Sequence, residues 1–167
     1  GEETLIGVGL ERQLHITMEN IAELIGEAKI KMLRVYLKDR SFYEEAKNIK
    51  ELCRLFDVPF IINDNVMLAK EIDADGVHVG QGDMACIKAR EILGPDKIIG
   101  VSAHTIEEAR IAKEQGADYL GVGAIFPTSS KDDAEVLGIK RLKEMTETVD
   151  LPMVAIGGIS YDNCLLL

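Results

Sequence analysis

Two short stretches with a common pattern decide the fold. Ala74-Asp75-Gly76-Val77-His78-Val79-Gly80 recurs loosely as Ala117-Asp118-Tyr119-Leu120-Gly121-Val122-Gly123. Each pattern is typical of a turn at an aspartate followed by a short apolar strand that ends at a glycine. The two copies are separated by two strand–helix units, and such internal similarity favours a barrel of βα units over an open doubly wound sheet.

The rest of the chain alternates in the same way. Short runs rich in β-branched residues are separated by segments with apolar residues at helical spacing, which indicates parallel βα units. The expected strands are 4–8, 30–37, 58–62, 75–79, 97–101, 118–123 and 152–156, and the expected helices are 18–28, 42–56, 83–93, 105–115 and 138–149. Thr105 and Glu108 form a candidate capping box, and Gly94 and Gly116 are candidate helix stops. No eighth strand is visible, so we predict one TIM-barrel-like domain over residues 1–167 that is short at its C-terminus.

Composition restricts the class of protein. A chain of 167 residues that is 47% hydrophobic suits one domain with one core. The net charge of -10 disfavours nucleic acid and anionic membrane surfaces as partners, so a phosphorylated ligand must be held by local donors or by a metal. The three cysteines are odd in number and lack metal-ligand spacing, which fits a reducing compartment. No apolar run is long enough to span a bilayer, and we expect a soluble, cytoplasmic protein.

Polar residues that are unusual for a core follow the expected strands. In parallel α/β folds the carboxyl ends of the strands meet at one rim, where sites are built. Asp64 and Asp83 follow neighbouring strands and suit Mg²⁺, which is usually held by one or two carboxylates together with substrate phosphates. The alternative for Asp83 is a helix cap before Met84. The other rim residues are Asn63, Gln81, Ser102, His104, Thr128 to Lys131, Gly157 and Gly158.

Two of these rim loops together suit an anion. Lys131 supplies a positive charge beside the hydroxyls of Thr128 to Ser130, and the Gly157-Gly158 turn lets backbone amides approach a phosphate closely. We therefore expect an anion between the two loops. His78 lies inside a strand pattern, and we expect it to be a barrel-interior histidine whose hydrogen bonds are satisfied.

Five ordered motifs resemble the thiamine phosphate synthase family and its sister group, the TenI-type thiazole tautomerases. They are Val58 to Asp64, Ala74 to Met84, Ile99 to His104, Gly121 to Lys131 and Val154 to Ile159. The resemblance implies a transferase of thiamine biosynthesis that moves the hydroxymethylpyrimidine group from its diphosphate to thiazole phosphate. In that reaction the diphosphate leaves first, and the thiazole nitrogen captures the resulting pyrimidine cation.

The resemblance also implies roles for individual residues. Asp64 and Asp83 would hold Mg²⁺ on the substrate diphosphate. The residues implied to contact that diphosphate are Lys38, Asn63, Ser102 and Lys131, and those implied to hold the thiazole phosphate are Thr128, Ser130, Gly157 and Gly158. Catalytic roles are implied for Ser102, Lys131 and His104.

Two departures from the family pattern keep alternatives open. In the register of the second strand, Tyr36 stands where the family has a diphosphate-binding arginine, so Arg34 or Arg40 would have to compensate. The missing eighth strand leaves two bare sheet edges. For these edges we expect pairing of the strand near Leu5 to Val8 with that near Met153 to Ile156, coverage by Leu165 to Leu167, or a homo-oligomer. The alternative functions are a TenI-like tautomerase with His104 as the proton-transfer group, and a non-catalytic or truncated barrel.

Overall fold

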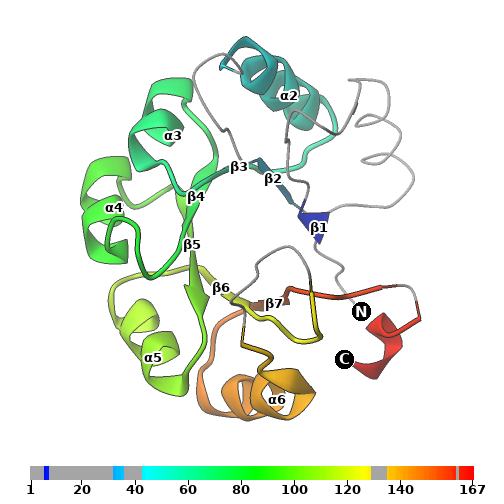
Figure 1. Cartoon of the computed structure of the whole chain (residues 1–167). Helices are drawn as coiled ribbons and strands as arrows, with labels where there is room; N and C mark the ends of the chain where they lie inside the picture. Colours follow the sequence, from blue (N-terminus) through cyan, green and yellow to red (C-terminus); the bar gives the residue numbers. More distant parts are fainter. Residues whose placement is uncertain (1–5, 8–31, 36–42, 129–134, 161) are drawn as a thin grey trace.

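Seven parallel strands form one sheet, which curves round with the helices on its outer side (Figure 1). The computed structural model describes residues 6–7, 32–35, 43–128, 135–160 and 162–167. The strands pair in chain order: β1 (Ile6–Gly7), β2 (Leu33–Val35), β3 (Phe60–Asn63), β4 (Gly76–Val79), β5 (Ile98–Ala103), β6 (Tyr119–Val122) and β7 (Met153–Ala155). An unbroken parallel order with helices on one side is the arrangement of a βα barrel, so the expected barrel-type fold is confirmed.

The helices cover the outer side of the curved sheet. They are α2 (Tyr43–Leu55), α3 (Val66–Ile72), α4 (Cys86–Leu93), α5 (Ile106–Glu114) and α6 (Gly138–Thr148), followed by a 3₁₀ turn, η2 (Cys164–Leu166). The sequence analysis missed α3, which Asn65 caps by accepting a hydrogen bond from the amide of Leu68 (2.9 Å). The expected helix 18–28 lies outside the described residues. Within the described ranges, no helix is both long and apolar enough to cross a membrane.

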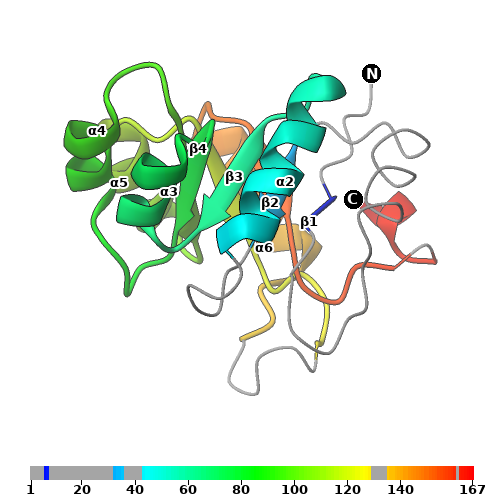
Figure 2. The same ribbon diagram turned by 90° about the horizontal axis from the view of Figure 1, so that it is seen from above.

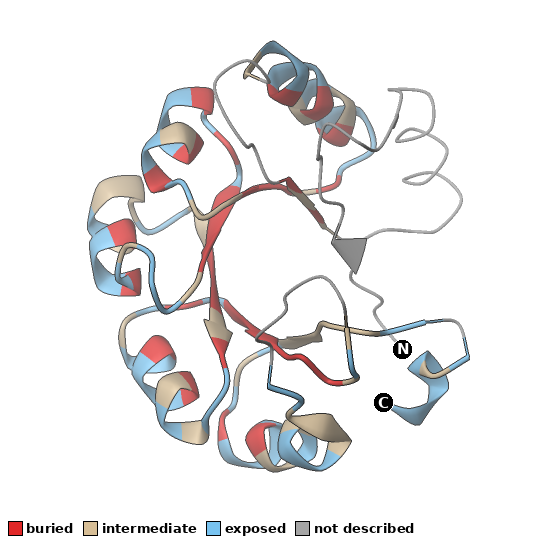
Figure 3. Ribbon diagram, in the orientation of Figure 1, coloured by how far each residue is buried: buried red, intermediate tan, exposed pale blue. Residues whose placement is uncertain are grey.

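The two faces of the sheet have different compositions because side chains alternate along a strand. The face toward the helices is apolar and buried. Figure 3 shows that buried residues are concentrated in the strands and on the sides of the helices toward them. The side chains of the apolar face include Leu33, Val35, Phe60, Ile62, Val77, Val79, Ile99, Val101, Leu120 and Val122, which pack with small helix residues such as Ala89 and Ala109. The other face lines the barrel interior and carries Arg34, His78, Ser102 and Tyr119 among the described residues. The core therefore lies between sheet and helices, and the polar groups lie inside the ring.

The repeated aspartates form the same hydrogen bonds in both copies. Oδ2 of Asp75 accepts from the amide of Phe60 (2.8 Å), and Oδ2 of Asp118 accepts from the amide of Ile99 (2.7 Å). Each aspartate thus fixes the start of the strand before its own. The similarity of the two stretches reflects a structural need at the amino ends of the strands.

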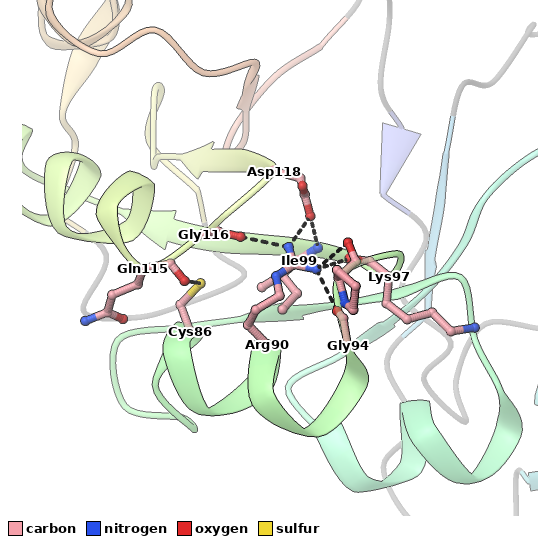
Figure 4. A network of polar contacts seen from close by, with 9 residues as sticks. Cys86, Arg90, Gly94, Lys97, Ile99, Gln115, Gly116 and Asp118 are labelled. Carbon is pink, nitrogen blue, oxygen red and sulfur yellow. Dashed lines mark hydrogen bonds and ion pairs between the residues drawn. The ribbon is translucent and has the colours of Figure 1, made fainter.

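Arg90 extends the second of these aspartate turns into a larger cluster (Figure 4). Its guanidinium donates to Asp118 (2.6 Å) and to the carbonyls of Gly94 (3.1 Å), Lys97 and Gly116 (2.7 Å). We call these five residues the Arg90 cluster. It joins the end of α4 to the starts of β5 and β6, at the end of the barrel opposite the rim.

The starts of α4 and α5 differ in detail from what the sequence signals indicate. The Thr105 hydroxyl accepts from the amide of Glu108 (3.1 Å), but the Glu108 carboxylate accepts from the amide of His104 (2.7 Å), one residue before the cap. The alternative role of Asp83, as the cap of a helix that begins at Met84, is wrong. The helix begins at Cys86, and Oδ2 of Asp83 accepts instead from the amide of Gly80 (2.7 Å) within the loop.

The outer strands β1 and β7 form the two open edges of the sheet. No ladder joins β7 to β1 in the described residues, so the expected direct pairing is not found there. Leu165, Leu166 and Leu167 are 87%, 63% and 49% exposed, so they bury little apolar surface, and their coverage of an edge stays a prediction. Seen from a second direction (Figure 2), η2 lies on the side of the molecule away from α4 and α5.

Candidate active site

Two carboxylates lie at the carboxyl ends of the adjacent strands β3 and β4. Asp64 follows β3 directly, with a left-handed φ of 64°, and its amide donates to the carbonyl of His78 on β4 (2.7 Å). Asp83 lies in the loop after β4, where Gly80 uses one of its oxygens. The structure therefore brings both residues to one rim. Among the described residues there is no group of three or more His, Cys, Asp or Glu that could hold a metal ion, so a cation here would need oxygen ligands from elsewhere.

Behind this rim, four polar side chains lie together inside the barrel. The positive charge of Arg34 acts on the hydroxyl of Tyr119, whose Oη lies 2.9 Å from Nδ1 of His78. Nε2 of His78 lies 2.9 Å from Oγ of Ser102. We call these four residues the interior relay. His78 is 2% exposed, and the prediction of a satisfied interior histidine is confirmed.

Two glycines make room for the rings of the interior relay. A Cβ on Gly100 would lie 2.1 Å from Cζ of Tyr119, and a Cβ on Gly121 would lie 2.8 Å from Cε1 of His78. The register places Gly100 between His78 and Tyr119, so the two rings meet over a position without a side chain. The backbone thus fixes where both rings can lie.

Burial controls the ionisation of the two rings. Desolvation, and secondarily the positive charge of Arg34, lowers the pKa of His78 to about 3. Desolvation raises the pKa of Tyr119 to about 12, against the opposing effect of Arg34. Both side chains are therefore neutral at physiological pH.

Two further rim residues are fixed by local contacts. Nε2 of Gln81, in the loop after β4, donates to the carbonyl of Ser102 on β5 (2.7 Å). The ring of His104 is half-exposed, and its Nδ1 lies 3.3 Å from the Glu108 carboxylate at the start of α5. The first contact ties Ser102 to the Asp83 loop, whereas the second holds His104 against its own helix.

The glycine turn after β7 packs against the loop after β6. Gly157 and Gly158 have φ values of 88° and 64°, and a Cβ on Gly158 would lie 2.4 Å from the carbonyl oxygen of Pro127. The amide of Phe126 donates to the carbonyl of Gly157 (3.1 Å). Asn163 holds the turn from the other side by donating to the carbonyl of Gly158 (2.9 Å). The structure thus brings this turn to the segment just before Thr128.

The expected site residues fall into two groups. Those that the structure describes lie in loops or strand ends at the rim: Asn63, Asp64, Asp83, Ser102, His104, Thr128, Gly157 and Gly158. Lys38, Ser130 and Lys131, together with Tyr36 and Arg40, lie outside the described residues.

Sequence reasoning missed Tyr119 and the role of Arg34. A usable signal lies in the repeat, where Gly76 and His78 of the first copy stand at the places of Tyr119 and Gly121 in the second. Large and small residues are exchanged at interior positions, which indicates rings that fill one another's space.

Comparisons with known proteins agree with this geometry. The profile of the family described as thiamine monophosphate synthase matches residues 8–166. A thiamine-phosphate synthase from Clostridium acetobutylicum is 46% identical over 153 residues, covering 92% of this chain and 72% of the relative. One from Clostridium tetani is 49% identical over 142 residues, covering 85% and 68%. The solved thiamine phosphate pyrophosphorylase from Pyrococcus furiosus superposes with a TM-score of 0.85 at 39% identity, covering 96% of this chain and 78% of that one.

Proposed function

Because this chain belongs to the thiamine monophosphate synthase family, we propose that it is a thiamine-phosphate synthase: a transferase that joins hydroxymethylpyrimidine, from its diphosphate, to thiazole phosphate and releases diphosphate. One observation carries the proposal. The carboxylates of Asp64 and Asp83 follow adjacent strands, and the Ser102 hydroxyl lies on the next strand of the same rim. Such a set suits a metal-bound diphosphate leaving group, which an isomerisation does not need.

A magnesium ion is part of this proposal, and the donor set fits it. Mg²⁺ prefers oxygen ligands and is commonly held by one or two carboxylates, with waters and substrate phosphates completing its coordination. Asp64 and Asp83 would be those carboxylates. When bound, the ion would supply positive charge against the negative charge that develops on the leaving diphosphate.

The remaining residues of the chain would bind and orient the two substrates. Asn63 and Ser102 would donate hydrogen bonds to the diphosphate, and Lys38 and Lys131 would add positive charge. Departure of the diphosphate leaves a cation that the thiazole nitrogen captures. No nucleophile from the protein is required, so donors aimed at the leaving group matter most.

The thiazole phosphate would bind between the loop that contains Thr128 and Ser130 and the Gly157-Gly158 turn. This site is supported by the close packing of the Gly157-Gly158 turn on the segment before Thr128, where a Cβ on either glycine would collide with backbone atoms. Backbone that can be approached closely, with amides in a turn of positive φ, suits an anion. Lys131→Ala should weaken phosphate binding in a titration, and an unchanged affinity would remove this part of the proposal.

The decisive assay follows the formation of thiamine phosphate from the two phosphorylated precursors, with and without Mg²⁺. In Asp83→Asn the side-chain oxygen can still accept from Gly80, but the negative charge is lost. We expect the rate at limiting Mg²⁺ to fall by about a hundredfold, as removal of a metal-bound charge worth several kcal/mol implies. Asp96→Asn is the matched control because Asp96 lies before β5, at the opposite end of the strands. No product from the parent chain with Mg²⁺ present would refute the function.

Two coarser expectations accompany the function. A reducing, cytoplasmic location suits Cys53, Cys86 and Cys164, none of which forms a disulfide with another described residue. Self-association would cover the sheet edges, and sedimentation of the purified chain would test it.

A further inference from the structure

The interior relay ends at Ser102, a residue of the proposed site. The chemistry of its members decides which group donates and which accepts in each hydrogen bond. Arg34, Tyr119, His78 and Ser102 come from four different strands, β2, β6, β4 and β5. Arg34 lies near Tyr119, and because a guanidinium has donors and no acceptor, it cannot accept the hydroxyl hydrogen of Tyr119. That hydrogen has to find an acceptor elsewhere.

That acceptor is the imidazole of His78. In the part of the chain that the structure describes, Nδ1 of His78 is the group within hydrogen-bond distance of Oη that can accept (2.9 Å). Tyr119 is 6% exposed, and a buried hydroxyl hydrogen without a partner destabilises the fold. Tyr119 therefore donates to Nδ1.

The tautomer of His78 decides whether Ser102 donates or accepts in its contact with the ring. The His78 ring is 2% exposed, and its two nitrogens lie against the hydroxyls of Tyr119 and Ser102 rather than a carboxylate, which favours a neutral ring with one N–H. An accepting Nδ1 places that hydrogen on Nε2. Nε2–H then donates to Oγ of Ser102 (2.9 Å). The hydroxyl hydrogen of Ser102 is not used within the relay, and Ser102 itself is only half-buried. It is left to point toward the mouth of the barrel.

We propose that Tyr119 and His78 are positioning residues that fix Ser102 as a hydrogen-bond donor toward an anionic oxygen of the substrate at the rim. With hydrogen on Nδ1 instead, Nε2 would accept the hydroxyl hydrogen of Ser102, and only lone pairs of Oγ would face the ligand. Those lone pairs would repel a diphosphate, whereas a fixed donor stabilises the negative charge that grows as the bond to the pyrimidine breaks. The assignment rests on the proposed function for the identity of the anion, but the relay itself is a property of the free protein.

The tautomer can be read directly, without substrate. Long-range ¹H–¹⁵N spectra of the parent chain distinguish a protonated from an unprotonated ring nitrogen, and the loss of one set of signals in His78→Gln assigns this ring among the three histidines. We expect hydrogen on Nε2 and none on Nδ1. In Tyr119→Phe, which removes the donor to Nδ1, the two tautomers should mix. Hydrogen on Nδ1 in the parent chain would overturn the proposal.

Kinetics then test whether the relay acts through Ser102. For Ser102→Ala we expect kcat/KM to fall about 10- to 100-fold, the effect of one hydrogen bond to a charged group. For Tyr119→Phe we expect a fall of about three- to tenfold, and the double variant should lose no more than Ser102→Ala alone. Thr148→Val, at the end of α6 and therefore at the end of the barrel opposite the rim, is the control for loss of a hydroxyl and should leave kcat/KM unchanged.

The outcomes separate the two proposals. Multiplicative losses in the double variant would show that Tyr119 does not act through Ser102 and would overturn the positioning role. If the parent chain makes no product, the proposed function fails, and the spectra still decide whether Ser102 is left with a free donor. Spectra of the parent chain also decide the question if a variant does not fold.

Discussion

The Arg90 cluster should stabilise the fold at the end of the barrel opposite the active site. In Arg90→Met the aliphatic part of the side chain is retained, while its donors to four partners are removed. The bonds to the carbonyls of Gly94 and Lys97 are half-buried and contribute about 1 kcal/mol each. The contacts to Gly116 and Asp118 are exposed and contribute about 0.5 kcal/mol each. Water will solvate part of what is lost, so we expect the free energy of unfolding to fall by about 2 to 3 kcal/mol.

Urea unfolding followed by far-UV circular dichroism measures this change, which corresponds to a fall in Tm of about 5 to 10 °C for a chain of this size. Arg54→Met is the matched control. Arg54 also lies in the last turn of its helix, but its contact is an exposed ion pair with Glu51 (3.0 Å). Its loss should cost about 0.5 kcal/mol or less.

Equal losses in the two variants would refute the reasoning, because they would show that the cluster adds nothing to an ordinary surface arginine. The measurement also checks the separation of stability from function. Since the cluster lies at the starts of β5 and β6, the folded Arg90→Met protein should keep the parent kcat/KM.

Three further outcomes are expected. Gly100→Ala should lower the free energy of unfolding by about 1 to 3 kcal/mol, because its Cβ would overlap Tyr119, whereas Gly82→Ala, where nothing lies within 4 Å, should have little effect; equal urea midpoints would contradict the packing. The pKa of His78 is lowered to about 3 from 6.5, so the stability linked to its neutral ring is fully present above pH 6.5 and declines as the pH falls toward 3. The free energy of unfolding should fall by at most about 2 kcal/mol at pH 5. Urea midpoints of the parent chain that fall no more steeply with pH than those of His78→Gln would contradict this. A thiol reagent should modify exposed Cys164 rapidly and buried Cys53, whose pKa burial raises to about 12, only on unfolding; two fast thiols in the native chain would show otherwise.

The order of strands and most of the helices could be predicted because their signals are local. Thr105 caps α5 and Gly94 ends α4, as their residue types indicate. The seven-residue helix α3 was missed because its end carries no glycine. Asp73 adopts the left-handed conformation there instead, with a φ of 55°. Its start was readable from Asn65 followed by apolar residues at a spacing of three.

The rim was predictable, whereas the interior was predictable only at His78. Asp64, Asp83 and Ser102 stand out because polar residues after buried strands are unusual, and the fold brings them to one rim. Tyr119 does not follow a strand, and a single tyrosine in an apolar strand resembles ordinary core, so its signal appears only when the two copies of the repeat are compared. Its contact with His78 joins strands that are not neighbours in the sheet, so the contact depends on how the sheet curves, which no local pattern specifies.

The exchange of ring and glycine between interior neighbours restricts how this barrel can diverge. Because the space above Gly121 is filled by His78 and that above Gly100 by Tyr119, a larger residue at either glycine is compatible only with a smaller partner. Positions 78 and 121, and positions 100 and 119, should therefore change together or not at all among descendants of this sequence. Each pair is inherited as a unit, and a substitution at one member alone has to pass through a strained intermediate.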